Sequence, residues 1–262
     1  MERLCLARRL YSSDDVRLSC YNTSMQDQLQ QLIANYSPSS DAIDLIKQTR
    51  ISLLAGISGA GKNTIKRALL DEGSDFHDIV SHTTRSPRQN NSIMETDGVD
   101  YHFISLDTAK EMLENYDFVE AKFVHGTVYG TSVAEIRKAH LDNKVAISDV
   151  DVQGVAEFKQ IAPDSVSIFI VPPSYDEWLS RLKARYSTEE EFFAEWHKRR
   201  QSSINELKHA LEVPYYHFII NDDIERATRV SREIILRDDV FYEKDIEARI
   251  LAEQLLEDIK NN

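Results

Sequence analysis

The feature that most constrains this chain is a glycine-rich turn placed directly after a short, mostly apolar run. Residues 51–55 suit a buried strand, and the sequence GISGAGK follows from Gly56 to Lys62. This is the P-loop pattern G-x-x-x-x-G-K, and residues 64–70 have a helical composition. Strand, glycine loop and helix in this order predict a site for the phosphates of a nucleoside triphosphate. A glycine turn without a ligand is the alternative, which the lysine at this spacing disfavours.

The loop itself supplies most of the predicted phosphate contacts. Glycines let backbone N–H groups turn toward phosphate oxygens, and the following helix adds the positive end of its dipole. Asn63 stands where this pattern has a Ser or Thr that binds Mg²⁺; its amide oxygen is still a hard ligand, so Asn63 is our candidate metal ligand. The predicted triphosphate contacts are Gly56, Ile57, Ser58, Gly59, Ala60, Gly61, Lys62, Asn63 and Thr64.

Composition narrows the class of protein. A chain of 262 residues is long enough for one large α/β domain or two small ones. The formal net charge of −13 argues against a general binder of nucleic acid polymers or acidic membranes. Both cysteines, Cys5 and Cys20, precede the P-loop, which favours a reducing, cytoplasmic location. No apolar run has the length of a membrane span.

The chain before the P-loop carries no chemical signature. Residues 1–24 contain several arginines but lack the apolar segment of a secretory signal, so we expect them to be disordered or to precede the true start at Met25. Residues 25–49 predict two short helices, separated at Pro38 and packed on the outside of the domain. Ser40 is the expected cap of the second helix.

Two arginines flank Ser-Pro in the loop that follows a predicted strand at 77–81. Arg85 and Arg88 would present two guanidinium groups, each suited to bidentate phosphate contact, although a solvated basic turn is the plainer alternative. The polar residues 89–98 resemble a flexible insertion. Residues 126–131 read as a turn before a helix at 132–141, and Glu120 lies within a predicted strand at 118–124.

The second half of the chain alternates strands and helices. The strand predicted at 144–151 ends in Asp149 and Asp151; a strand-end aspartate in P-loop proteins often faces the metal, but it can also be an ordinary helix cap. Arg181 and Arg185 lie on one face of a helix. Residues 187–191 read as a mobile linker to a helix at 192–211. The acidic segment 238–262 predicts a helix docked on its own domain, with a dimer or partner contact as the alternative.

Taken together, residues 50–237 resemble guanylate kinases. The resemblance is carried by GISGAGKNT, SHTTRSPR, DYHFIS, FVEAKFVHGTVYGT, DVDVQG, FIVPPS, RLKAR and IINDD, in that family's order. It implies an α/β P-loop NTPase fold: a parallel sheet flanked by helices, a small mixed GMP-binding subdomain at about 82–131, and a helical lid at about 176–211. The extensions 1–49 and 238–262 lie outside it.

The resemblance also implies roles for individual residues. Arg181, Arg185 and Arg199 would close from the lid onto the ATP phosphates, and with Lys62 and Arg85 they form the implied catalytic set. Asn221 would lie near the adenine. Glu120 would accept both donors on one edge of guanine. The implied GMP contacts are Ser81, Arg85, Arg88, Tyr101, Glu120, Tyr129, Thr131, Asp149 and Asp151.

The implied activity is phosphorylation of GMP, and of dGMP, by ATP with Mg²⁺, giving ADP and GDP. The alternative is a catalytically inactive, protein-binding module of the same family, and such modules typically lose the P-loop lysine and glycines. Three departures from the family pattern stand out: Asn63, the longer segment between Arg88 and Tyr101, and the lid sequence after Arg185.

Overall fold

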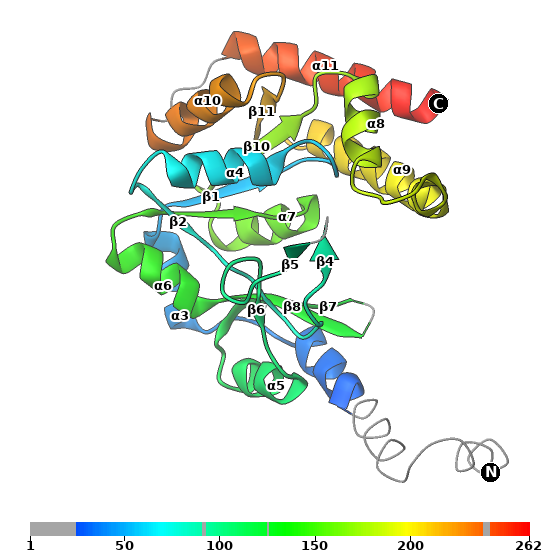
Figure 1. The fold of residues 1–262 in the computed structure, drawn as a ribbon. Coiled ribbons are helices and arrows are strands. Elements are labelled where there is room, and N and C mark those ends of the chain that lie inside the picture. Colours follow the sequence, from blue (N-terminus) through cyan, green and yellow to red (C-terminus); the bar gives the residue numbers. More distant parts are fainter. Residues whose placement is uncertain (1–24, 91–92, 125, 238–241) are drawn as a thin grey trace, which may run out of the picture. The chain divides into compact units, whose positions relative to one another are not determined.

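The computed structural model describes residues 25–90, 93–124, 126–237 and 242–262 (Figure 1). The chain forms two compact units. Of the described residues, unit 1 contains 25–43, 80–89, 93–124 and 126–135, and unit 2 contains 44–79, 90, 136–237 and 242–262. The expectation for residues 1–24 concerns a part of the chain outside the described residues.

Unit 2 is built on a five-stranded parallel sheet in the order β11-β10-β1-β9-β2. Every residue of β1 is buried, as expected for a parallel strand with both faces covered. The strands predicted at 51–55 and 216–220 are confirmed at both ends. The bounds are β1 Ile51–Ala55, β2 Phe76–Asp78, β9 Val145–Asp149, β10 Val166–Val171 and β11 Tyr216–Ile220.

Helices cover this sheet. α4 and α10 pack against each other, and α7 packs on β1 and α9 (Figure 1). α11 contacts α9 and β11 and buries Ala248, Ala252 and Ile259, so the C-terminal helix docks on its own domain as predicted. The bounds are α4 Lys62–Asp71, α7 Val152–Ile161, α8 Tyr175–Lys183, α9 Glu189–Glu212, α10 Ile224–Arg237 and α11 Tyr242–Asn261.

Unit 1 contains a four-stranded mixed sheet in the order β6-β3-β8-β7. Residues 25–34 are helical, and their Met25 and Leu29 are buried with Phe118 and Val128 in one apolar core. The prediction of a helix here is confirmed, and one face of it, with Met25 and Leu29, joins the core of unit 1. The bounds are β3 His82–Thr83, β6 His102–Phe103, α5 Leu106–Glu114, β7 Phe118–Val124 and β8 Thr127–Ser132. Two helices contain a point in the sequence where one unit ends and the other begins: α3 Ser40–Gln48 and α6 Val133–Leu141.

Two helix starts differ from the predictions by a few residues. Ser40 lies inside α3, and the Oγ of Ser39 instead accepts the Ala42 N–H at 3.2 Å. The segment 187–191 is not a linker, because α9 already begins at Glu189 with Thr188 as its cap. The acidic first turn of α9 is favoured by the helix dipole, a signal that outweighed the segment's polarity.

Residues 126–131 were predicted as a turn, but only Gly126 lies in a turn, and β8 covers Thr127–Ser132. β8 pairs with both β7 and β3, and its Gly130 permits a close approach: a Cβ there would lie 2.7 Å from the Glu120 carbonyl oxygen. The glycines suggested a turn, whereas one of them serves sheet packing. The stretch 89–98 is likewise not wholly irregular, since β4 Gln89–Asn90 and β5 Ile93–Met94 form a two-stranded sheet.

Candidate active site

The glycine loop follows β1 directly and takes backbone conformations that require glycine. Gly61 has φ +95°, and a Cβ on it would lie 2.1 Å from Asn221 Nδ2. A Cβ on Gly56 would lie 2.5 Å from the carbonyl oxygen of Ile170 in β10. The sequence predicted glycines for phosphate access; here they also let the loop lie against neighbouring backbone and side chain.

The substitution G61A should disturb this loop more than an alanine elsewhere in the unit. We expect about 1–3 kcal/mol of backbone strain, with a lower melting temperature and weaker binding of a non-hydrolysable ATP analogue. Gly73→Ala is the matched control, because the nearest heavy atom to a Cβ there lies 3.6 Å away. Calorimetric titration and thermal unfolding of both variants test this; unchanged binding in G61A would contradict it.

Asn221 holds the loop from the end of β11. Its side chain is buried, and Nδ2 donates to the Ala60 carbonyl oxygen at 2.8 Å. The backbone carbonyl oxygen of Asn221 accepts hydrogen bonds from both terminal nitrogens of Arg181 at 3.2 Å. Asn221 thus joins the phosphate loop to α8; its predicted contact with adenine stays a prediction.

Lys62 is folded back onto the loop that it completes. Its Nζ donates to the carbonyl oxygen of Gly56 and lies 3.5 Å from that of Ile57. Burial lowers the pKa of Lys62, and the negative charges of Glu206, Asp149 and Asp151 oppose that shift. A half-buried lysine whose ammonium group lies against the glycine loop is well suited to attract phosphate.

Further cations and one tryptophan surround the loop. Arg185 donates from Nη1 to Ser58 Oγ at 3.0 Å, and burial together with Arg199 lowers the pKa of Arg185. Trp178, fully buried in α8, donates from Nε1 to the Ser58 carbonyl oxygen at 2.9 Å. Arg199 is half exposed and donates to the Tyr186 hydroxyl at 3.1 Å. Arg185 therefore contacts the loop, Arg181 reaches it through Asn221, and Arg199 lies near enough to Arg185 to influence its charge.

The two strand-end aspartates have different surroundings. Asp151 is the N-cap of α7 and accepts the Gly154 N–H at 2.6 Å, which is the capping alternative left open above. Asp149 forms an ion pair with Lys66 of α4 at 2.8 Å. β9 pairs with β1 so that Asp149 lies opposite Leu54, close to the start of the glycine loop.

The donors near the loop fit a hard divalent cation. Asn63 is exposed in the first turn of α4 and offers an amide oxygen, and Asp149 offers a carboxylate at the neighbouring strand end. Burial opposes the charge on Lys66, but Asp149 and Asp78 outweigh it and raise the pKa of that lysine. An ammonium group is therefore already present beside Asp149.

Unit 1 gathers the residues predicted to hold a second phosphate. Arg85 forms a bidentate ion pair with Glu95 (Nη1–Oε2 2.5 Å, Nη2–Oε1 2.9 Å), and the guanidinium lies 4.7 Å from the Tyr101 ring centre. Tyr101 and Tyr129 meet edge to face at 6.2 Å. The Glu95 carboxylate also accepts the backbone N–H of Arg88 at 2.8 Å. The Arg88 side chain is exposed.

The predicted guanine contacts in unit 1 lie on neighbouring strands. Glu120 of β7 is opposite Thr131 of β8, and its Oε1 accepts the Thr131 N–H at 3.0 Å. Ser81 precedes β3, and its carbonyl oxygen accepts the His102 N–H at 2.9 Å. Asp149 and Asp151, predicted for the same nucleotide, belong to unit 2.

Several residues near these sites were not predicted. Glu206 of α9 is a carboxylate whose pKa is raised by burial and lowered in part by Ser202 and Lys62. Lys66, Glu95 and Trp178 contact predicted site residues through tertiary packing. None of the four belongs to a motif with a fixed spacing, and the amphipathic spacing of Trp178 in α8 indicated only a core position.

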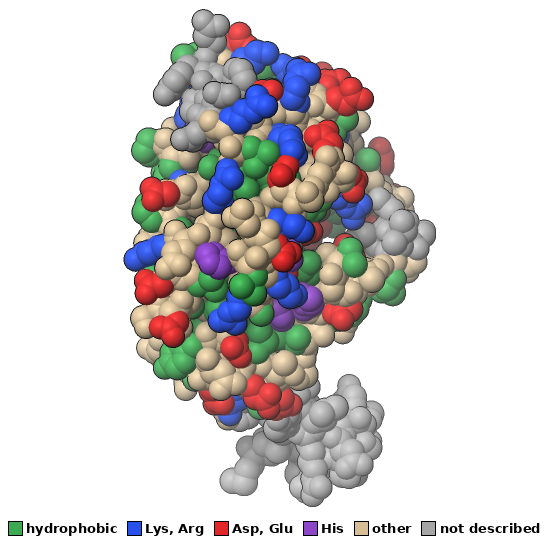
Figure 2. Space-filling view, turned by 90° about the vertical axis from the view of Figure 1, so that its left-hand side faces the viewer, with side chains coloured by type: hydrophobic (Ala, Val, Ile, Leu, Met, Phe, Trp, Pro, Cys, Tyr) green, Lys and Arg blue, Asp and Glu red, His purple; other side chains and the backbone are tan. Residues whose placement is uncertain are grey.

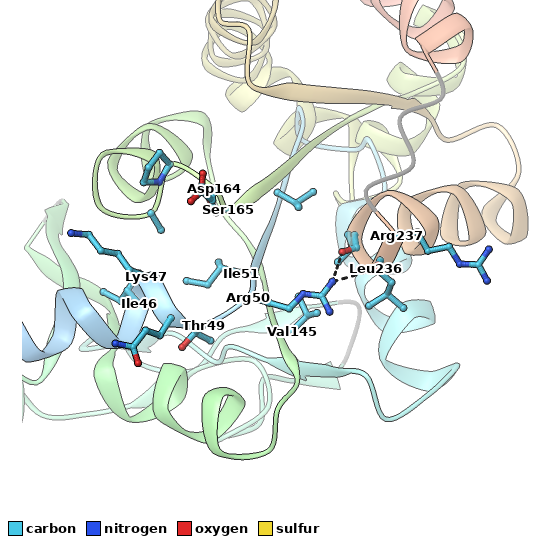
Figure 3. A pocket seen from close by; sticks show the side chains of 15 residues that line it. Ile46, Lys47, Thr49, Arg50, Ile51, Val145, Asp164, Ser165, Leu236 and Arg237 are labelled. Carbon is cyan, nitrogen blue, oxygen red and sulfur yellow. Dashed lines mark hydrogen bonds between the residues drawn. The ribbon is translucent and has the colours of Figure 1, made fainter.

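A cavity of about 430 Å³ in unit 2 lies away from the loop (Figure 3). Its lining includes Ile51, Val145 and Val166, which begin β1, β9 and β10. The Arg50 side chain points toward Leu236 and donates to the Ile235 carbonyl oxygen at 2.9 Å. Since the glycine loop follows the carboxyl end of β1, a cavity at the amino ends of the strands is not part of the phosphate site.

The face of the molecule in Figure 2 carries charged side chains of both signs. In the view of Figure 2, Lys and Arg side chains are interspersed with Asp and Glu rather than gathered in one continuous surface. Among the helices that the structure describes, none has both the length and the apolar character needed to cross a membrane.

Comparisons with known proteins identify the family of this chain. The guanylate kinase family model matches residues 48–237. A guanylate kinase of Syntrophotalea carbinolica is 38% identical over 184 residues, covering 70% of this chain and 83% of that protein. A guanylate kinase of Caldanaerobacter subterraneus is 35% identical over 211 residues, covering 80% of this chain and 98% of that protein.

A solved structure has the same fold. The crystal structure of guanylate kinase from Anaplasma phagocytophilum aligns with a TM-score of 0.55 at 24% identity, covering 78% of this chain and 94% of that one. The predicted fold class, a parallel sheet flanked by helices with a second mixed sheet, is confirmed. With its phosphate loop intact and most of its length matched, this chain belongs to the guanylate kinase family.

Proposed function

We propose that this protein transfers the γ-phosphoryl group of ATP to GMP, and to dGMP, giving ADP and GDP. The observation that carries the proposal is the complete glycine loop with Lys62, which Arg185 contacts directly and to which Arg181 is joined through Asn221. Membership of the guanylate kinase family supports GMP as the acceptor. A protein-binding module would have no need of a lysine held against the loop.

Phosphoryl transfer needs positioning and positive charge more than covalent help. In the proposed reaction Lys62 leaves the loop carbonyl oxygens for the β- and γ-phosphates, and the three predicted lid arginines add charge around the transferring group. Asn63 and Asp149 would hold Mg²⁺, which when bound neutralises charge on the phosphates. Asn221 keeps the loop in shape and, in this proposal, lies near the adenine.

In this proposal the acceptor is chosen mainly by residues of unit 1. Arg85, Arg88, Tyr101 and Tyr129 would bind the GMP phosphate through guanidinium forks and hydroxyl groups. Guanine carries N1–H and N2–H₂ side by side, and one carboxylate, Glu120, can accept from both. Adenine lacks that pair of donors and would leave the carboxylate unpaired, which can cost a factor of roughly 10⁴ in specificity. Ser81, Thr131 and Asp151 complete the proposed guanine contacts.

The GMP-binding arm and the lid have separate proposed roles. Residues 82–131 would act as the GMP-binding arm and residues 176–211 as a lid that excludes water from the reacting phosphates. We place the protein in the cytoplasm with ATP and GMP as its partners. Association into a homodimer remains a prediction.

An acceptor panel tests the proposed function. Purified protein with Mg-ATP should release ADP rapidly with GMP and at least about 10³-fold more slowly with AMP, CMP or UMP, because only guanine pairs fully with Glu120. A coupled ADP assay measures this. If no acceptor supports ADP release with either Mg²⁺ or Mn²⁺, the protein is the inactive binding module instead.

A further inference from the structure

One ammonium group joins three elements beside the phosphate loop. Lys66 lies one helical turn after Lys62 on α4, and its Nζ is 2.9 Å from Asp78 Oδ1 and 2.8 Å from Asp149 Oδ1. The lysine side chain is 14% exposed, whereas those of Asp78 and Asp149 are 27% and 29% exposed. The cation is therefore enclosed, and both carboxylates keep an open side.

The position of the two carboxylates explains why their charge matters. Asp78 and Asp149 close the neighbouring strands β2 and β9, and β9 lies next to β1, from which the glycine loop starts. Both oxygens are within contact distance of the same nitrogen, so they lie close to each other. Without a cation between them, two such carboxylates would repel each other and attract a divalent metal ion.

We propose that Lys66 is a built-in cation that keeps this carboxylate pair occupied, so that a divalent metal binds this end of the sheet only together with a nucleoside triphosphate. Lys66 acts on the metal through Asp149 and is a positioning residue rather than a catalytic one. The ammonium group holds Asp149 in place from the α4 side and offsets its charge. The triphosphate then supplies the negative charge that the metal needs. This inference rests on the proposed binding of a triphosphate at the loop, but not on the identity of the acceptor.

Manganese binding to the full-length protein without nucleotide tests the inference. Free Mn²⁺ is measured by electron paramagnetic resonance during titration. We expect weak binding by the wild type and at least about tenfold tighter binding by K66M, in which two carboxylates face each other without a cation. Addition of a non-hydrolysable ATP analogue should give the wild type tight Mn²⁺ binding. Because no phosphoryl transfer is read, a failure of the proposed kinase activity would not produce the same result.

Matched variants separate this role from simple stabilisation of the fold. D78N removes one carboxylate of the group but leaves the ion pair between Lys66 and Asp149. We expect both D78N and K66M to be less stable than the wild type, but only K66M to bind Mn²⁺ more tightly. K66R keeps the positive charge and should behave as the wild type. Adding D78N to K66M should abolish the gain.

Two results would overturn the inference. One is K66M binding Mn²⁺ no more tightly than the wild type; the other is tight Mn²⁺ binding by the wild type without nucleotide. Circular dichroism checks that each variant is folded, and if K66M is not, the same titration of K66Q decides, since glutamine is also uncharged.

Discussion

Replacing Lys62 with methionine is expected to lower kcat for GMP phosphorylation by at least about 10²-fold, because a positioned charge in a water-poor site is lost. Methionine keeps much of the length and volume of lysine, so the loop should retain its shape. Steady-state kinetics with saturating GMP measure the change. Lys208→Met is the control, since Lys208 is an exposed residue of α9 in the same unit.

The same variant should not be less stable than the wild type. Burial lowers the pKa of Lys62 below its ordinary value of 10.5, so the charged lysine costs folding free energy. That cost is fully present at pH values below the folded-state pKa and disappears as the pH rises through 10.5. At neutral pH, thermal unfolding of K62M should therefore occur at the wild-type temperature or above. A K62M protein that is unfolded, or one that keeps normal kcat, would contradict this account.

The second large effect is expected for Glu120→Gln. Glutamine can accept one guanine N–H but points an NH₂ group at the other donor, so kcat/KM for GMP should fall by about 10²–10³-fold. The carbonyl oxygen of glutamine can still accept the Thr131 N–H that now bonds to Glu120, so stability should change little. GMP kinetics and calorimetric titration with an ATP analogue measure the two properties separately.

A neutral exchange elsewhere in unit 1 provides the comparison. Glu114 is 52% exposed on α5 and lies 3.8 Å from Lys110, so Glu114→Gln should leave GMP turnover unchanged. Full GMP turnover in the Glu120 variant would show that guanine is read by another residue. Loss of ATP analogue binding together with GMP turnover would show that the substitution acts through the fold.

The parts of the fold that could be predicted have local signals. Residues 51–55 and 216–220 form strands at the predicted positions, because each is a short, mostly apolar run bounded by glycine or polar residues. The glycine loop was equally clear, since its spacing reflects backbone geometry at Gly56 and Gly61. Strand β8 was not predicted because glycine is typical of turns. In this strand, the missing side chain of Gly130 allows β8 to lie close to the Glu120 backbone of β7.

The parts of the site that could not be predicted depend on packing between distant segments. Glu95 lies in residues 89–98, the stretch that resembled a flexible insertion. Its carboxylate accepts hydrogen bonds from the Arg85 guanidinium and from the Arg88 backbone N–H. Lys66 gains its partners only because β2 and β9 are neighbours in the sheet. Neither pairing has a fixed sequence spacing, so local patterns carry no information about it.

The fate of a labelled phosphoryl group tests the central claim most directly. Purified protein is incubated with ATP labelled in its γ-phosphate and with unlabelled GMP, and the products are separated. The account predicts that the label appears in the β-phosphate of GDP, in equal amount to the ADP formed. Label recovered in inorganic phosphate, or left in ATP while GMP is unchanged, would contradict it.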